Sequence, residues 1–185
     1  MNRKNLVIFP TLVQETSLPL FVIEEVLDSL KQFKVENNLT EKSWNDYLFT
    51  TLNKFNCIIS YLKLNNLKTA IQLGVQEFTI NFPKLKNLDF KLAESWVNFN
   101  YKYSFQNSHI HDLKCISGVV YIQCKGTSEE GNIVFNSPHY LDHLQTDFEY
   151  VPSVGKMLIF HGSTPHSVRF NKLDSTRISL SFNCY

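Results

Sequence analysis

Length, composition and charge exclude several classes of protein. The 185 residues suit one domain with a sizeable core, and 15 phenylalanines favour a packed interior over disorder. The formal net charge of +1, from 18 basic and 17 acidic residues, gives no electrostatic reason to expect binding to nucleic acid or to an anionic membrane.

The cysteines and the N-terminus indicate a cytoplasmic protein. Because no two of the four cysteines form a CxxC pair, we expect free thiols in a reducing compartment. The apolar run Leu6–Phe9 is too short for a signal peptide, and no segment approaches the length of a membrane span. We therefore expect no membrane partner and a cytoplasmic location, which would be the host cytoplasm if the gene is carried by a phage.

The first half of the chain is predicted to be mainly helical. Leu6–Phe9 is expected to form a short strand, and Ser17–Pro19 to open a helix. The apolar residues of that helix recur at helical spacing and predict one buried stripe: Val22, Ile23, Val26, Leu27 and Leu30. A second helix is expected to begin with Asn65 or Asn66 as its cap. Its predicted buried face consists of Leu67, Ile71, Val75 and Phe78.

The second half changes to the period of β-strands near Ser95. The candidate strands are Ser95–Phe105, Leu113–Gln123, Asn132–Asn136, Phe148–Val151, Lys156–Phe160, Ser167–Asn171 and Thr176–Asn183. Many short strands at this spacing predict an α+β fold with a double-sheet jelly roll (a double-stranded β-helix) as its core. We expect a single domain over 1–185, in which 1–92 is a helical preface with supporting elements and 93–185 is the jelly-roll core.

Three histidines of this second half could hold a metal ion. His109 and His111 stand two apart before an apolar strand, so on a regular strand they point to the same face. His166 follows another apolar strand and could complete one side of a coordination sphere, leaving the other side open. In the alternative interpretation, the histidines are merely solvated at strand ends.

An arginine further along the chain offers a partner for a carboxylate. Arg177 begins an alternating segment, and neighbouring antiparallel strands would bring it into one cavity with His166. Its guanidinium is a fixed fork that pairs bidentately with carboxylates. A metal and a carboxylate-bearing co-substrate together define a type of reaction. In the alternative interpretation, Arg177 is a surface residue of its strand and binds no co-substrate.

An ordered set of motifs adds a resemblance to a known family. The motifs are Trp96–Asn98, His109–His111, Ser117–Ile122, Glu130–Pro138, Pro152–Phe160, Pro165–Val168 and Arg177–Asn183. In this order they resemble the 2-oxoglutarate- and Fe(II)-dependent oxygenase superfamily over roughly residues 93–185. The resemblance is strongest to small oxygenases of marine phages and bacteria, and more distant to the prolyl 4-hydroxylases.

The resemblance implies that Fe(II) is bound by His109, His111 and His166. His111 stands where most of the superfamily has a carboxylate, so the bound metal would keep one more unit of positive charge than usual. Neutral imidazoles still suit Fe(II). Asp112 is the alternative ligand: on a regular strand it faces away from His109, but a β-bulge could turn it inward.

The same resemblance implies a site for 2-oxoglutarate. Arg177 would bind its far carboxylate, and Ser179, on the same strand face, would donate a hydrogen bond to it. Tyr121 shares parity with the two histidines of the His-x-His motif if the strand has no bulge, and could reach the co-substrate or belong to the core. Asn98 is a weaker candidate.

The implied reaction couples hydroxylation of a prime substrate to the oxidative decarboxylation of 2-oxoglutarate by O2, with succinate and CO2 as products. A peptidyl side chain is the first hypothesis for the prime substrate, and a small molecule is the second. Ser137–Leu144 is a candidate lid, with His139 and His143 facing solvent. Two other classes stay open: a three-histidine cupin-type dioxygenase that does not use 2-oxoglutarate, and a non-catalytic jelly-roll binding or structural protein with incidental histidines.

Overall fold

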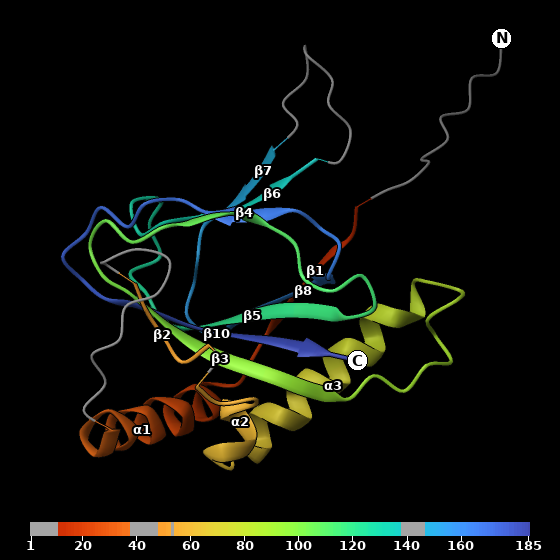
Figure 1. Cartoon of the computed structure of the whole chain (residues 1–185), viewed down its shortest axis with the longest axis horizontal. Helices are drawn as coiled ribbons and strands as arrows, with labels where there is room; N and C mark the ends of the chain where they lie inside the picture. The colour runs from red at the N-terminus through yellow and green to blue at the C-terminus, as the bar shows by residue number, and fades with distance from the viewer. Residues whose placement is uncertain (1–10, 38–47, 53, 138–146) are drawn as a thin grey trace, which may run out of the picture.

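Two antiparallel sheets packed face to face form the framework of the chain (Figure 1). The computed structural model describes residues 11–37, 48–52, 54–137 and 147–185. The six-stranded sheet has the order β1 (Val13–Ser17), β8 (Lys156–His161), β5 (Ile116–Gln123), β10 (Arg177–Cys184), β3 (Leu92–Asn100), β2 (Leu48–Thr50). The four-stranded sheet has the order β4 (Gln106–His109), β9 (His166–Val168), β6 (Ile133–Asn136), β7 (Asp147–Tyr150). This double-sheet arrangement is the predicted jelly roll.

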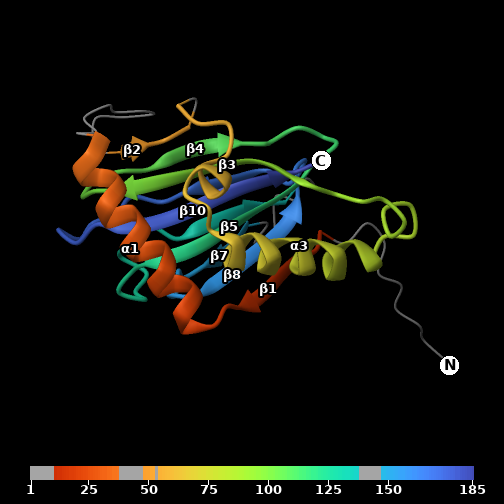
Figure 2. The same ribbon diagram turned by 90° about the horizontal axis from the view of Figure 1, so that it is seen from below.

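Helices cover the outer face of the six-stranded sheet (Figure 2). They are α1 (Leu20–Asn37), α2 (Ile58–Tyr61) and α3 (Asn65–Ile80). The predicted stripes are confirmed, because the named apolar residues of α1 and α3 lie in the core between helices and sheet, with Leu27 partly buried. Leu64, however, is the N-cap of α3 and makes no side-chain capping bond, so the predicted asparagine cap is wrong. Burial of Leu64 determines where this helix begins.

The six-stranded sheet has an apolar outer face and a partly polar inner face. On β10, Ile178, Leu180 and Phe182 pack into the helix-covered core, whereas Arg177, Ser179, Ser181 and Asn183 face a cavity between the sheets. This alternation is the period of two that a strand imposes. A second, smaller apolar cluster closes the space between the sheets: Val119, Tyr121, Ile133, Phe135, Leu158 and Phe160.

Several short elements depart from the predictions. No strand was expected at Val13–Ser17, Leu48–Thr50 or Gln106–His109, and no helix at Ile58–Tyr61. These elements have three to five residues each, and the three strands form by pairing with β8, β3 and β9, which lie far away in the sequence. β3 ends at Asn100 and does not continue to residue 105, because the chain turns there and Tyr103 has a left-handed backbone with φ of 68°.

Some predictions concern parts of the chain that lie outside the described residues. These are the strand at Leu6–Phe9 and the candidate lid after Ser137, with His139 and His143. In the described part of the chain, no helix combines the length and the apolar character that crossing a membrane requires.

Candidate active site

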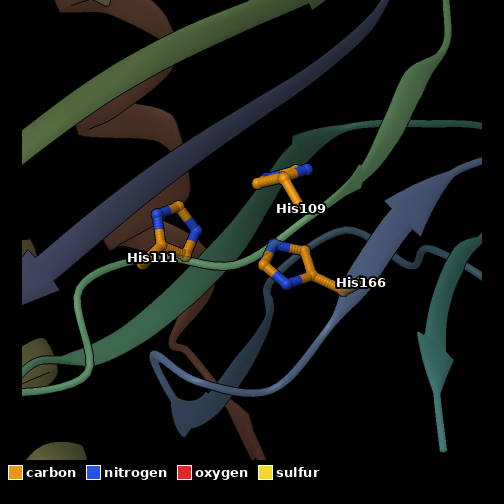
Figure 3. Close-up of side chains that lie close together, drawn as sticks. All are labelled: His109, His111 and His166. Carbon is orange, nitrogen blue, oxygen red and sulfur yellow. The ribbon is translucent and has the colours of Figure 1, made fainter. Parts of the chain in front are cut away.

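Three histidine side chains converge between the two sheets (Figure 3). His109 ends β4 and pairs directly with His166, which begins β9, while His111 lies in the loop after β4. One possible ligand nitrogen from each ring lies within 4.8 Å of those of the other two. The ring centroids of His109 and His166 are 4.3 Å apart. The three residues that were expected to meet therefore do meet.

Backbone carbonyls orient two of these rings. His109 Nδ1 lies 2.8 Å from the carbonyl oxygen of Asn107, and His166 Nδ1 lies 2.9 Å from that of Thr164. Because a carbonyl only accepts hydrogen bonds, Nδ1 carries the proton in both rings, and Nε2 keeps its lone pair. Metal-binding histidines usually donate their other ring N–H to a carbonyl or carboxylate oxygen in this way. The three rings therefore fit a divalent metal ion.

Burial disfavours the protonated form of two of the three rings. Desolvation by burial, and after it the nearby His109, lower the pKa of His166 to about 3 and that of His111 to about 4. A protonated imidazole has no lone pair for a metal, so neutral rings are a requirement for ligation.

His111 reaches the cluster from a loop, and Asp112 stays outside it. The side chain of Asp112 accepts a hydrogen bond of 2.8 Å from the backbone N–H of Lys114, and its carboxylate is exposed. The predicted reason for the convergence of His109 and His111, one regular strand, is wrong because β4 ends at His109. The loop is held instead by Gly162: its carbonyl accepts from His111 N–H at 2.8 Å, and its N–H donates to the Cys115 carbonyl at 2.9 Å.

This contact leads to a prediction about Gly162. A Cβ at this position would lie 2.3 Å from the carbonyl oxygen of Asp112 and 2.5 Å from the Cys115 sulfur. Gly162→Ala should therefore displace the loop that carries His111, cost about 1–3 kcal/mol in the free energy of unfolding, and weaken metal binding roughly ten-fold or more. Denaturant unfolding and metal titration measure the two effects.

Gly74→Ala is the matched control for Gly162→Ala. It crowds Ile159 and Met157 on the helix-covered side of the sheet, with contacts of 2.8 and 2.9 Å, far from the histidines. Its stability can change, but its metal affinity should not. Equal metal affinity in Gly162→Ala and wild type would show that this loop is not positioned by Gly162.

A cavity of about 640 Å³ extends from the histidines along the polar face of the six-stranded sheet. The predicted residues Arg177, Ser179 and Tyr121 line it, as does Asn98. Arg177 is 2 % exposed; its Nη1 donates to the carbonyl of Gly131, while its Nε has no hydrogen-bond partner. Burial lowers the pKa of Arg177. A buried guanidinium with a free donor is suited to receive an anion such as a carboxylate.

The sequence reasoning missed a buried acid close to Arg177. Glu130 is fully buried, and its carboxylate accepts hydrogen bonds from the backbone N–H groups of Lys125 and Gly126. Its negative charge, together with Tyr121, raises the pKa of Arg177 against the effect of burial. Glu130 begins one of the motifs, but nothing in the sequence indicated that its side chain points inward.

Two arguments for the cavity residues need correction. His166 and Arg177 do not lie on neighbouring strands: β9 and β10 belong to different sheets, and the two residues line one cavity between them. Tyr121 does line the cavity, but its parity with the histidines was meaningless, because β4 and β5 also lie in different sheets. His161 is half-buried, contacts Ser163 Oγ at 2.7 Å, and is not part of the histidine cluster.

Comparisons with known proteins agree with this geometry. Residues 94–183 match the family model described as "Putative 2OG-Fe(II) oxygenase". HygX from Streptomyces hygroscopicus, solved with nickel and 2-oxoglutarate bound, aligns with a TM-score of 0.69 at 10% identity, covering 94% of this chain and 82% of that one.

Two further solved structures share the fold. The α-ketoglutarate-dependent epimerase SnoN from nogalamycin biosynthesis aligns with a TM-score of 0.66 at 12% identity, covering 93% of this chain and 77% of its own. A prolyl-4-hydroxylase of Pseudomonas putida aligns with a TM-score of 0.62 at 15% identity, covering 93% and 91%. Identities this low indicate a common fold and do not carry over a substrate. Among curated protein sequences, none matches the chain.

Proposed function

We propose that this chain, whose residues 94–183 match the model of the 2OG-Fe(II) oxygenases, hydroxylates a second substrate while 2-oxoglutarate is decarboxylated to succinate. One observation carries the proposal: three converging histidines and a buried arginine with a free donor share one cavity. A metal site and a carboxylate site so close together are what this reaction requires.

His109, His111 and His166 would hold the iron. His109 and His166 would use Nε2 for this. Three protein ligands on one side leave open positions for co-substrate and O2, and bound Fe(II) supplies the activation of O2. Since all three ligands are neutral, nothing in the ligand set offsets the charge of the metal. An anionic co-substrate is therefore favoured at this site.

The other cavity residues would bind and enclose the co-substrate. Arg177 would pair with its far carboxylate, and Ser179, on the same face of β10, would donate a hydrogen bond to it. Tyr121 lies opposite Ser179 in the register of β5 and β10 and could add its hydroxyl. The apolar cluster around Tyr121, which includes Val119, Ile133 and Phe160, would exclude water from this end.

A cupin-type dioxygenase without 2-oxoglutarate would leave Arg177 unexplained. A buried cation with an unpaired donor is costly, and an incoming anion would pair with the Nε that Glu130 and Gly131 leave free. A non-catalytic jelly roll would likewise leave the orientation of two histidines by backbone carbonyls without a reason. We propose that the enzyme acts in a reducing cytoplasm, in keeping with its four free cysteines.

Succinate release tests the proposed reaction. Protein supplied with Fe(II), ascorbate and 2-oxoglutarate should form succinate, slowly without the prime substrate, and should form none when the metal is removed by a chelator. Metal-dependent consumption of O2 without succinate would point to the cupin-type chemistry. Absence of both, with no metal bound, would indicate a non-catalytic protein.

The prime substrate is proposed to be either a peptidyl side chain or a small molecule. The similar structures include a prolyl-4-hydroxylase and a HygX structure that holds hygromycin B, so the fold accommodates both kinds.

A further inference from the structure

We propose that Glu94 is a cation-binding subsite for the prime substrate, and that this substrate carries an alkylammonium or guanidinium group near the carbon that reacts. The inference rests on the proposed function, because it assumes that Arg177 is occupied by the co-substrate. It identifies the chemical class of the second substrate, which the family does not determine.

The charges of the cavity wall are few and lie far apart. Among the lining residues that the structure describes, Glu94 and Arg177 are the only Asp, Glu, Lys or Arg side chains. Arg177 begins β10, and Glu94 pairs with Asn183 near the end of the same strand. Six residues of an extended strand span about 20 Å. A short dicarboxylate held by Arg177 therefore does not reach Glu94, whose charge is left for another ligand.

The histidines divide the cavity between these two ends. The ring of His111 lies 5.7 Å from that of Trp96, which faces the cavity from the middle of β3. Glu94 is on the same face of β3, two residues away, which corresponds to about 7 Å along the strand. A substrate whose cationic group contacts Glu94 would thus place a carbon a few bonds away beside the histidine cluster.

Neutral groups hold Glu94 in place without balancing its charge. Asn183 Nδ2 donates to Glu94 Oε2 at 2.8 Å, and Asn183 Oδ1 accepts from Ser117 Oγ at 2.8 Å. This chain of hydrogen bonds crosses β3, β10 and β5 and fixes the carboxylate at the edge of the cavity. No ion pair within the described part of the chain includes Glu94.

The surroundings of Glu94 suit an alkyl chain that ends in a cation. The indole of Trp96 offers an aromatic face for an ammonium or guanidinium group. Leu52 and Phe55 provide apolar wall at the same end, since the neighbouring Thr51 and Asn56 are hydrogen-bonded to Val97 and Ser95 of β3. Glu94 itself is exposed, so this end opens to solvent. A lysine or arginine side chain of a peptide and a free aliphatic amine share this chemistry.

Matched pairs of probes test the subsite. Nα-acetyl-lysine methylamide is paired with its neutral analogue Nα-acetyl-norleucine methylamide, and n-hexylamine with n-hexanol. Each is titrated calorimetrically into nickel-loaded protein saturated with 2-oxoglutarate, so that binding is read without turnover. Wild type should bind the cation of at least one pair about ten-fold more tightly than its neutral partner. If only the lysine methylamide is preferred over its neutral partner, the substrate is assigned as a peptidyl side chain. If only n-hexylamine is preferred over n-hexanol, the substrate is assigned as a small molecule.

Three variants localise the effect. Glu94→Gln should abolish the preference for the cation and leave 2-oxoglutarate affinity unchanged, while Glu94→Asp should keep part of the preference because it keeps the charge. Glu77→Gln, an equal change on the exposed surface of α3, should behave as wild type. Thermal unfolding of each variant checks that the fold is retained.

The two proposals fail in different ways. Absence of any preference for cations in wild type, including absence of binding by every probe, overturns the subsite, as does a preference that survives in Glu94→Gln. The titrations are repeated on metal-free protein, and 2-oxoglutarate is titrated separately. A preference for cations without binding of 2-oxoglutarate refutes the proposed reaction alone, whereas 2-oxoglutarate binding without the preference refutes the subsite alone.

Discussion

Arg177→Ala should lower the affinity for 2-oxoglutarate by about ten- to a hundred-fold and leave metal binding intact. A hydrogen bond to a charged group contributes roughly 1.5–3 kcal/mol, which corresponds to this range. Two structural facts favour the upper part of it. Arg177 is buried, so solvent screens the contact weakly, and its Nε has no other partner to lose. The histidines do not depend on Arg177, since they are oriented by the carbonyls of Asn107 and Thr164.

The measurement is an anaerobic titration of 2-oxoglutarate into the Fe(II)-loaded protein, followed by the metal-to-ligand absorption band. Arg177→Lys should recover only part of the affinity, because lysine keeps the charge and loses the planar fork. Removal of the arginine also leaves Glu130 buried without a nearby cation, so unfolding of each variant must be followed in parallel. Equal affinity in wild type and a folded Arg177→Ala would remove the co-substrate assignment.

His111→Ala should reduce metal affinity by more than the roughly 10- to 100-fold that loss of an outer partner of a ligand costs. Asp112→Ala should leave it nearly unchanged, because the Asp112 side chain is engaged with the backbone of Lys114 and lies outside the cluster. Metal content after dialysis and competition with a chelator give both values. The reverse result would restore a site of two histidines and one carboxylate.

His161→Ala is the matched control for the metal experiment. His161 is also a half-buried histidine of this part of the chain, but its Nδ1 contacts Ser163 and it is not among the converging rings. Its replacement should leave metal affinity at the wild-type value. A loss equal to that in His111→Ala would mean that the cluster of His109, His111 and His166 is not the metal site.

Features that depend on local backbone geometry could be predicted from the sequence. The period of two on β10 places Arg177 and Ser179 on one face, and the helical period of α1 buries Val22, Val26 and Leu30. Both follow from the geometry of a single element, whatever it packs against. The order of motifs in the second half likewise predicted the double-sheet core, because turn residues between short apolar runs allow few other folds.

Features that depend on pairing between distant segments were decided only by the tertiary structure. β1 and β2 lie at the two edges of the six-stranded sheet, because the backbone groups of β8 and β3 supply their hydrogen bonds. The burial of Glu130 also depends on such contacts, since two backbone N–H groups, those of Lys125 and Gly126, donate to its Oε2.

The histidine cluster has features of both kinds, some predictable from the sequence and some decided only by the tertiary structure. The residue types made a metal site one of two interpretations, beside solvated histidines, and the resemblance to the oxygenases favoured the metal site. The sequence could not tell that His111 lies in a loop held by Gly162, nor that Tyr121 and Arg177 face the histidines from the opposite sheet. The period of side chains along a strand says nothing about which sheet that strand joins, because hydrogen bonds and burial between residues far apart in the chain determine the pairing.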